Sequence, residues 1–256
     1  MTLKNKISNF KSIAKKLELP LDNLLKIEKI IEFAGGSLKL VGGNVRDLIL
    51  GKKITSEPDL TTDLTPVELV SCMDSKKMKY IKSGYDHGTI TIIIDKTRFE
   101  ITSLRRDIIT DGRRAKVLYT KDWLEDAKRR DFTINSIYCD LRGIILDPYN
   151  GISDLENQRV IFIGNPSDRI KEDYLRILRF LRFSIKYSTS FDKNGLSACI
   201  KLKKKINFLS VERRILELRK VILERSFEEN FKKISKTGIL DNTLDTKIYD
   251  KNIYHL

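Results

Sequence analysis

Acidic residues at two places in the chain have the spacing expected of a metal-dependent site. Glu57 and Asp59 lie two residues apart, so their side chains would share a face if the segment is extended. That spacing would let one pair of carboxylates hold two divalent ions, as in-line phosphoryl transfer requires. Glu100 alternates with Phe99 and Ile101 in an expected strand, which makes it a candidate third acid facing the same cleft. The alternative, solvated loop and strand carboxylates, is disfavoured because the acids occur together.

Other metal-binding residue types are scarce. The chain has two histidines, His87 and His255, and three widely separated cysteines outside any Cys-x-x-Cys spacing. A multi-histidine site, a thiolate zinc site and a disulfide framework are therefore disfavoured. Any catalytic metal must rest mainly on oxygen ligands, which favours Mg²⁺ and also admits Mn²⁺.

A glycine pair, Gly42-Gly43, joins the expected strand Leu38–Val41 to the helical pattern Asn44–Leu50. Glycines at this place let a phosphate approach the backbone, and a helix N-terminus offers amide donors to it. Arg46 would add a bidentate phosphate contact. A plain tight turn is the commoner explanation of two glycines before a helix, so this motif alone is weak evidence.

The charge balance predicts a polyanionic partner. The formal net charge is +14, and half of that excess lies between Lys201 and Lys236, with 12 Lys/Arg against 5 Asp/Glu. Nucleic acid is the leading candidate partner, bound at this C-terminal segment. A solvated helix face is the alternative explanation. Apolar stretches such as Ile90–Ile94 are far shorter than the roughly 18 residues of a membrane span, so we expect a cytoplasmic protein without a membrane partner.

The elements that must position these residues form two halves. Hydrophobic periodicity, glycines and capping signals predict helices and strands up to Ile163, then helices only, with a boundary near Asn165. The expected helices of the first half are Lys4–Leu19, Asp22–Ile31 with Asp22 as its cap, Asn44–Leu50 and one beginning with the Thr65-Pro66-Val67-Glu68 capping box; the expected strands are Leu38–Val41, Thr89–Ile94, Arg98–Ser103, Ile144–Leu146 and Arg159–Ile163.

Several runs, in order, resemble the motifs of the class II tRNA nucleotidyltransferase (CCA-adding) and poly(A) polymerase family. The runs are Gly42–Gly51 with Asp59–Pro66, Gly84–Ile90 with Thr110–Ala115, Arg129–Asn135, Glu172–Arg179 and Ser210–Arg214. The resemblance implies an α+β fold: a polymerase beta-like, mixed-sheet catalytic head at 21–165 and an all-helical neck with a shortened body at 166–256.

The resemblance also implies roles for particular residues. The catalytic acids would be Glu57, Asp59 and Glu100, with two Mg²⁺ ions on Glu57 and Asp59; Gly42, Gly43 and Arg46 would contact the triphosphate, Arg130, Asp131 and Asn135 the ribose side, and Asp173, Arg176 and Arg179 the base; Lys203, Lys204, Lys205 and Arg213 would bind RNA.

Asp173 and Arg176 also have a physical interpretation as base readers. Three residues apart on a helix, they would share a face and offer an acceptor beside a donor. Cytosine and adenine both present an amino donor next to a ring-nitrogen acceptor, so one such pair would accept CTP and ATP and refuse UTP and GTP. An intrahelical salt bridge is the alternative interpretation.

The resemblance therefore implies addition of CMP, AMP or both to the 3′ end of tRNA from CTP and ATP, with poly(A) addition as the nearer alternative. Two departures qualify it. The family's first metal-binding acid is normally aspartate, where this chain has Glu57, so a catalytically impaired RNA-binding homologue is a further alternative. Little sequence follows Arg225, so a partner protein or self-association would replace the family's tRNA-gripping body.

Overall fold

The computed structural model describes residues 6–54, 57–110, 115–223 and 227–242. The chain forms two compact units, the first made of residues 1–109 and 115–152 and the second of residues 110–114 and 153–256. This division lies N-terminal to the boundary expected near Asn165. The proposed limits of head and neck, 21–165 and 166–256, stay a prediction.

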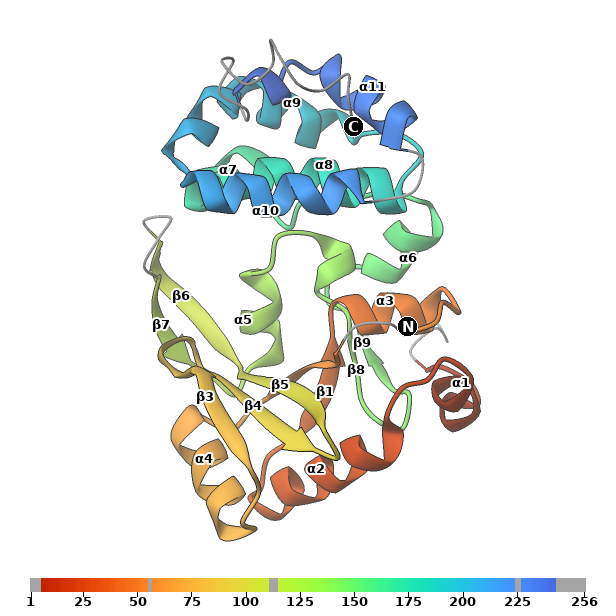
Figure 1. The fold of residues 1–256 in the computed structure, drawn as a ribbon, viewed down its shortest axis with the longest axis vertical. Helices are drawn as coiled ribbons and strands as arrows, with labels where there is room; N and C mark the ends of the chain where they lie inside the picture. The colour runs from red at the N-terminus through yellow and green to blue at the C-terminus, as the bar shows by residue number, and fades with distance from the viewer. Residues whose placement is uncertain (1–5, 55–56, 111–114, 224–226, 243–256) are drawn as a thin grey trace. The chain divides into compact units, whose positions relative to one another are not determined.

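The first unit is built on a seven-stranded mixed sheet in the order β3-β4-β5-β2-β1-β8-β9, with a separate pair formed by β6 and β7 (Figure 1). β2 and β5 run parallel, whereas β1 pairs with β2 and with β8 antiparallel. The elements are α1 (Phe10–Lys16), α2 (Leu21–Phe33), β1 (Leu38–Val41), α3 (Gly43–Ile49), β2 (Asp59–Thr62), α4 (Pro66–Ser75), β3 (Tyr80–Gly84), β4 (Thr89–Ile94), β5 (Thr97–Ser103), β6 (Arg105–Thr110), β7 (Ala115–Tyr119), α5 (Trp123–Lys128), β8 (Tyr138–Cys139) and β9 (Ile145–Leu146), with 3-10 turns at Tyr85–His87 and Thr133–Asn135. Helix α6 (Gly151–Glu156) begins in the first unit, and its last four residues belong to the second.

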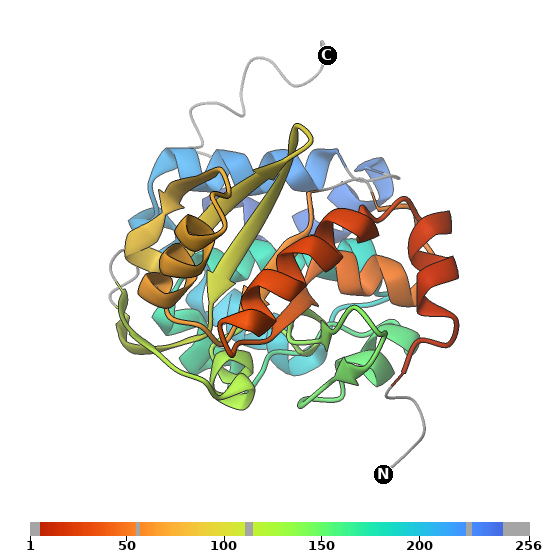
Figure 2. The same ribbon diagram turned by 90° about the horizontal axis from the view of Figure 1, so that it is seen from below.

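One face of this sheet is covered by α2 and α4, which lie in front of the strands in Figure 2. The core there joins apolar residues of both helices to Leu60 of β2 and to Phe99 and Ile101 of β5. Because side chains alternate along a strand, Asp59 and Glu100 face the opposite side of the sheet. The packing of the apolar residues of β2 and β5 against α2 and α4 thus directs Asp59 and Glu100 to the opposite face of the sheet.

Local signals explain where two of the helices begin and end. The backbone N–H of Thr65 donates to Glu68 Oε2 at 2.7 Å, and the N–H of Glu68 donates to Thr65 Oγ1 at 3.3 Å, which confirms the expected capping box. Gly51, with φ of 63°, directly follows the end of α3 and adopts a left-handed conformation that favours glycine.

The second unit is helical throughout its described part from residue 166 onward. Its elements are α7 (Pro166–Glu172), α8 (Leu175–Tyr187), α9 (Lys193–Leu202), α10 (Val211–Ile222) and α11 (Phe227–Ser235), with 3-10 turns at Lys203–Phe208 and Leu240–Asn242. Together with the mixed sheet of the first unit, this confirms the expected α+β class. No described helix combines the length and apolar character needed to cross a bilayer.

Three expected elements differ in the structure. The helix expected over Lys4–Leu19 begins only at Phe10, because Asn9 has a left-handed backbone with φ of 54°; residues 1–5 lie outside the described part. Asp22 lies in the first turn of α2, and Pro20 occupies the cap position. The strand expected over Arg159–Ile163 is wrong: the N–H of Arg159 bonds to Asp154 O, closing the turn after α6. Val160, Phe162 and Ile163 are buried without forming a strand.

Candidate active site

The parallel pairing of β2 and β5 brings two of the expected acids together. Asp59 and Glu100 are register partners, and both face away from the core. Desolvation raises the pKa of Asp59, the negative charge of Glu100 raises it further, and Arg130 and Arg46 oppose the rise. Two adjacent carboxylates with such mutual repulsion would gain from a bound cation.

The pair suits Mg²⁺, which is usually held by one or two carboxylates together with substrate phosphates and water. Within the described ranges, no three acidic, histidine or cysteine side chains gather as a metal-binding group. Glu57 is exposed and precedes β2, next to residues 55–56, which lie outside the described part. Its role as a metal ligand stays a prediction.

The glycine turn lies beside the first residue of β2. Gly42 has φ of 69° and ψ of −123°, a conformation that glycine adopts far more readily than other residues. A Cβ atom on Gly42 would lie 4.0 Å from Asp59 Oδ2, so the turn passes close to the carboxylate. Asn44, fully buried, accepts a 2.9 Å hydrogen bond from the backbone N–H of Asp59. Sequence reasoning quoted Asn44 only as part of the motif and missed that it ties α3 to β2.

A buried chain of hydrogen bonds runs from α3 to the 3-10 turn at Thr133–Asn135. Arg46 is only 6% exposed, and its Nη1 donates to Ile134 O at 3.3 Å and to Asn135 Oδ1. Asn135 Nδ2 donates to Asp131 Oδ1 at 2.7 Å. The structure therefore brings together three expected nucleotide contacts, and their guanidinium, amide and carboxylate groups hold one another in place.

Arg130 belongs to a neighbouring network that the sequence did not reveal. Its Nη2 lies 3.0 Å from Oδ2 of the buried Asp126, and the hydroxyl of Tyr138 donates to the same oxygen at 2.7 Å. Burial alone would raise the pKa of Asp126, but Arg130 and Arg129 lower it to about 2. The spacing of four residues between Asp126 and Arg130 is the signal that could have indicated this pair.

In the second unit, the expected sharing of one helix face by Asp173 and Arg176 is wrong. α7 ends at Glu172, and Asp173 is extended, with φ of −154°, before α8 begins at Leu175. Asp173 Oδ1 accepts from the N–H of Leu175, the first residue of α8, at 3.0 Å, so the aspartate lies at the junction of the two helices and not within either. The backbone N–H of Arg176 still donates to Asp173 O at 3.0 Å, which keeps the two residues adjacent.

Each of these two side chains has another partner. Asp173 Oδ2 lies 2.8 Å from Arg213 Nη2, and Arg176 Nη1 lies 2.6 Å from Glu172 Oε2. An intrahelical Asp173–Arg176 salt bridge is therefore not what the structure shows. Arg213, expected to bind RNA, contacts the candidate base reader, which links α10 to the α7–α8 junction.

The remaining expected residues lie apart within the second unit. The guanidinium of Arg179 lies 5.2 Å from the centre of the Phe183 ring, one turn further along α8. Lys203, Lys204 and Lys205 begin the 3-10 turn that follows α9, and Lys205 Nζ lies 5.0 Å from the Phe208 ring centre. Their roles in nucleotide and RNA binding stay predictions.

Comparison with known proteins identifies the first unit more closely. Residues 38–161 match the poly(A) polymerase head domain. The chain is 42% identical over 193 residues to the human protein named CCA tRNA nucleotidyltransferase 1, mitochondrial, covering 73% of this chain and 44% of that one. It is 38% identical to the CCA-adding enzyme of Staphylococcus epidermidis, covering 80% of this chain and 50% of the relative.

Solved structures show the same fold. The Bacillus stearothermophilus CCA-adding enzyme in complex with CTP aligns with a TM-score of 0.77 at 27% identity, covering 86% of this chain and 53% of that one. The Thermotoga maritima CCA-adding enzyme complexed with tRNA aligns with a TM-score of 0.75 at 19% identity and shows the fold alone. This chain spans about half the length of these relatives. The chain belongs to the tRNA nucleotidyltransferase and poly(A) polymerase family, whose head domain it carries at residues 38–161.

Proposed function

We propose that this protein is a template-independent nucleotidyltransferase that adds CMP, AMP or both to the 3′ end of tRNA and releases pyrophosphate. The observation that carries the proposal is the register pairing of Asp59 with Glu100 beside the Gly42 turn. It lies within a head domain that matches a named tRNA nucleotidyltransferase at 42% identity.

The metal would be held by Asp59, with Glu100 beside it and Glu57 as the second predicted ligand. Bound Mg²⁺ would supply activation of the attacking ribose hydroxyl and charge stabilisation of the leaving pyrophosphate. The residues around it would do the positioning. The Gly42 turn leaves space for a phosphate next to Asp59, since glycine has no side chain to occupy it.

Arg46 and Asn135 would orient the triphosphate and the ribose. Their mutual hydrogen bond, together with the Asn135–Asp131 bond, keeps these side chains in one arrangement before substrate arrives. Such preorganisation spares the cost of reordering side chains in the transition state. Arg130 would act by holding the adjoining backbone, since it already pairs with Asp126.

Base selection would rest on Asp173 and Arg176 even though no single helix face carries them. The ion pair with Arg213 orients the Asp173 carboxylate, and the ion pair with Glu172 orients the Arg176 guanidinium. A carboxylate acceptor and a guanidinium donor fixed in this way would match the pairing edges of cytosine and adenine. Arg179 is the third residue proposed for this contact.

The test is incorporation of nucleotides into tRNAs that lack A, CA or CCA. Purified protein would receive CTP and ATP singly and together, and the products would be sequenced. CC, A or CCA addition supports the proposal and identifies the step. Long adenosine tails would favour poly(A) polymerase, and RNA binding without incorporation would favour an impaired homologue.

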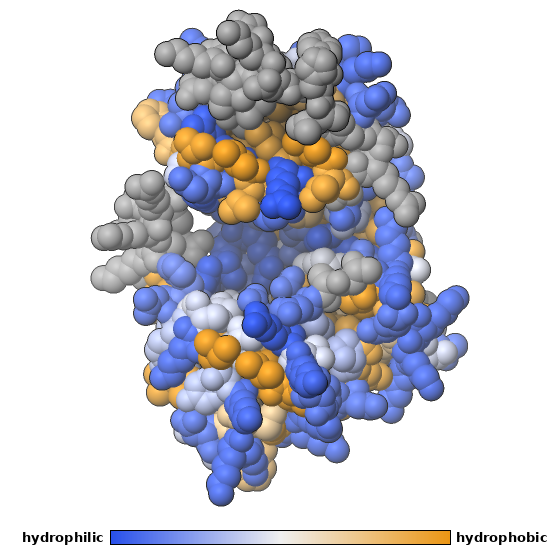
Figure 3. Space-filling model, viewed as in Figure 1, coloured by the Kyte–Doolittle hydropathy of each residue, from blue (hydrophilic) through white to orange (hydrophobic). Residues whose placement is uncertain are grey.

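We also infer that two copies of the chain associate through the outward face of α10. Figure 3 shows apolar side chains gathered over this helix. Ile215 and Leu216 are 53% and 58% exposed. If two copies of α10 paired antiparallel, with the centre of the pairing between Ile215 and Leu216, Glu212 of each copy would lie opposite Arg219 of the partner subunit. The pairing would therefore contain two equivalent ion pairs, one at each end. Opposite charges at both ends of an apolar centre make the face complementary to itself.

The compartment is proposed to be the cytoplasm, as composition suggests, although three relatives at 38–44% identity are named as mitochondrial. Fractionation of source cells with an antibody to the protein would decide between the two compartments. Detection in purified mitochondria alone would overturn the cytoplasmic assignment.

A further inference from the structure

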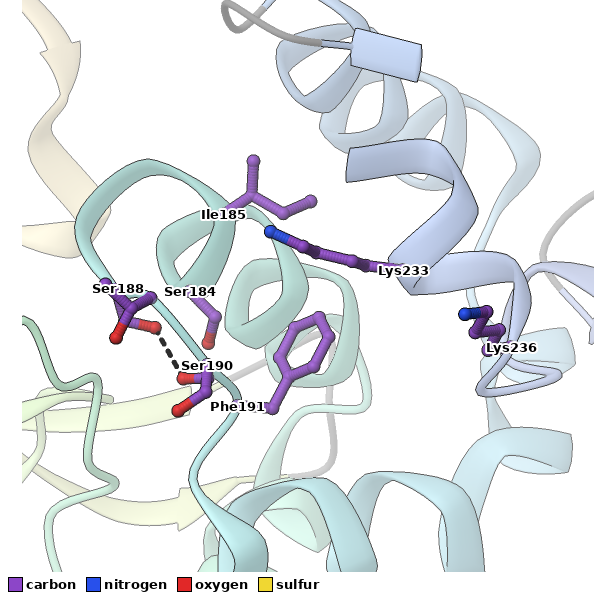
Figure 4. A pocket seen from close by; sticks show the side chains of 8 residues that line it. Ser184, Ile185, Ser188, Ser190, Phe191, Lys233 and Lys236 are labelled. Atoms are coloured by element: carbon purple, nitrogen blue, oxygen red, sulfur yellow. Dashed lines mark hydrogen bonds between the residues drawn. The ribbon is translucent and has the colours of Figure 1, made fainter. Parts of the chain in front are cut away.

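A cavity of about 290 Å³ lies within the second unit, between the C-terminal end of α8, the segment that follows it, and α11 (Figure 4). It is lined by Ser184, Ile185, Ser188, Thr189, Ser190, Phe191, Lys233 and Lys236. None of these residues belongs to the site proposed for nucleotidyl transfer. The volume is near the lower end for small-molecule sites.

The hydroxyl of Ser184 is the first sign that this cavity takes a ligand. Ser184 is 2% exposed, and its Oγ has no hydrogen-bond partner among the described residues. Leaving a buried hydroxyl without a partner costs about 1–3 kcal/mol. In contrast, Ser188 Oγ nearby donates to Ser190 O at 2.7 Å. A polar ligand atom in the cavity would satisfy Ser184.

Phe191 provides a fixed aromatic surface on the wall of the cavity. Its ring lies 6.0 Å from that of Phe180, which stacks in turn on Phe162 at 5.3 Å. Phe162 and Phe180 are buried, whereas Phe191 is partly exposed. The row of rings holds Phe191 in place and leaves it available as a stacking platform for a planar base.

Two lysines bring positive charge to the other side of the cavity. Figure 4 shows the side chain of Lys233 extending from α11 toward Ile185 of α8, and Lys236 lines the cavity from the turn after α11. Lys233 pairs with Glu229 at 2.8 Å, whereas Lys236 has no ion pair among the described residues. Ammonium groups near an aromatic surface and a buried hydroxyl suit a molecule that carries both a base and a phosphate.

We propose that this cavity binds a nucleoside monophosphate unit, with the base against Phe191 and Ile185, the phosphate near Lys236, and a polar atom bonded to Ser184. The ligand is either a free nucleotide or one nucleotide of an RNA strand, since both present the same chemistry. The site does not depend on the proposed transfer reaction, because it uses none of the residues assigned to that reaction.

The test follows the methyl group of Ile185 by NMR in protein labelled at isoleucine methyl groups, with Ile185→Val to assign the signal. Titration with CMP should shift this signal with saturation. Cytidine and inorganic phosphate should each bind about tenfold more weakly or worse, since each supplies half of the contacts. No saturable shift with CMP, or equal affinity for cytidine, would overturn the proposal.

Substitutions locate the contacts. Lys236→Gln should weaken CMP binding by about tenfold, while Lys232→Gln, an exposed lysine of α11 outside the cavity, should not change it. Ser184→Ala should weaken binding yet raise the melting temperature of the free protein, because it removes an unpartnered buried hydroxyl. Equal CMP affinity in Lys236→Gln and in the unmodified protein would overturn the phosphate assignment.

The source of the ligand is distinguished by a phosphorylated dinucleotide, pCpC. Affinity more than about tenfold above that of CMP would identify a nucleotide of an RNA strand, and equal affinity would identify the free nucleotide. Either result supports the proposed site. If the protein transferred no nucleotide to tRNA but the Ile185 methyl signal still shifted with CMP, the result would count against the proposed function and not against this cavity site.

Discussion

Asp59 has the most constrained environment among the acids expected to bind metal. Its backbone N–H is held by Asn44, its register partner is Glu100, and the Gly42 turn lies beside its carboxylate. The environment of Asp59 therefore depends on two other stretches of chain, the turn into α3 and strand β5. A substitution at Asp59 removes a charge without removing these supports, so its effect on activity can be separated from an effect on folding.

Asp59→Ala is expected to abolish Mg²⁺-dependent incorporation while leaving the fold intact. Loss of one group that stabilises charge in the transition state commonly lowers the rate by about a hundredfold to a thousandfold. The measurement is incorporation of labelled nucleotide into tRNA, with circular dichroism as the check on folding. Equal incorporation by the variant would refute the metal assignment. Glu57→Asp is the informative partner, and a higher rate of incorporation would show that the longer glutamate side chain limits that rate.

Arg176→Ala is expected to relax the choice of base more than it weakens binding overall. A well-oriented bidentate contact is worth about 1–3 kcal/mol of discrimination, which corresponds to roughly tenfold to hundredfold. Glu172→Gln should have a smaller effect in the same direction, because Glu172 only orients the guanidinium. The measurement is the ratio of UTP to CTP incorporation. An unchanged ratio in Arg176→Ala would show that this arginine is structural only.

At the scale of elements, the sequence predicts well where a strong local signal is present. The Thr65–Glu68 capping box begins α4 as expected, and β1 and β4 have the expected bounds. One strand prediction is wrong because a local backbone hydrogen bond competes with strand formation. Arg159–Ile163 is apolar enough for a strand, but its first N–H is used to close the turn after α6.

The candidate site shows the same division. The acids, the glycine pair, Arg46 and Asn135 were each expected from their motifs. The Arg46–Asn135 bond and the Asp126–Tyr138 bond were not, because these partners meet only in the folded unit. The helix break at Asp173 was also missed. Continuous helical periodicity gives no sign that α7 ends at Glu172 and that a new helix begins at Leu175.

The Asp126 network predicts how stability changes in acid. The pKa of Asp126 is about 2 when folded, below its ordinary value of 3.8, so the ionised carboxylate contributes stability above about pH 4. That contribution, about 2 kcal/mol, should be lost as the pH falls from 4 toward 2.

The measurement is urea unfolding of the unmodified protein and of Asp126→Asn between pH 7 and pH 2. The difference in free energy of unfolding should shrink by about 2 kcal/mol over the acidic part of this range. Asp168→Asn, which changes an exposed carboxylate on α7, serves as the control. A difference that stays constant with pH would contradict the assignment of the shift to Asp126.

At the scale of the whole molecule, the charge excess predicts a steep salt dependence of tRNA binding. Replacing Lys203, Lys204 and Lys205 together with glutamine should flatten the plot of log affinity against log salt by about 2–3 units, since each phosphate contact contributes about 0.7–0.9. The control is the same replacement of Lys11, Lys15 and Lys16 on α1. An unchanged slope in the first variant, with a flatter one in the control, would move the RNA to α1.

The self-complementary face of α10 predicts a charge-swap rescue. A single helix pair buries little surface, so the dimer is expected to be weak and concentration-dependent. Arg219→Glu alone should shift sedimentation toward the monomer, because Glu212 would then face a like charge. Glu212→Arg combined with Arg219→Glu should restore the dimer. A protein that stays monomeric at every concentration, or a single variant that dimerises unchanged, would exclude this pairing.

The parallel pairing of β2 with β5 has a consequence for the order in which the protein folds. Asn44 reaches Asp59 across a short stretch of chain, but Glu100 can pair with Asp59 only after the long intervening segment, including the β4–β5 hairpin, has closed into a loop. Loop closure over such distances costs entropy that only later contacts repay, so non-local pairings tend to form slowly. We therefore expect the carboxylate pair to be completed late in folding, after the hairpin exists. A nascent or partly refolded chain would then acquire its helices and its nucleic-acid affinity before it acquires catalysis.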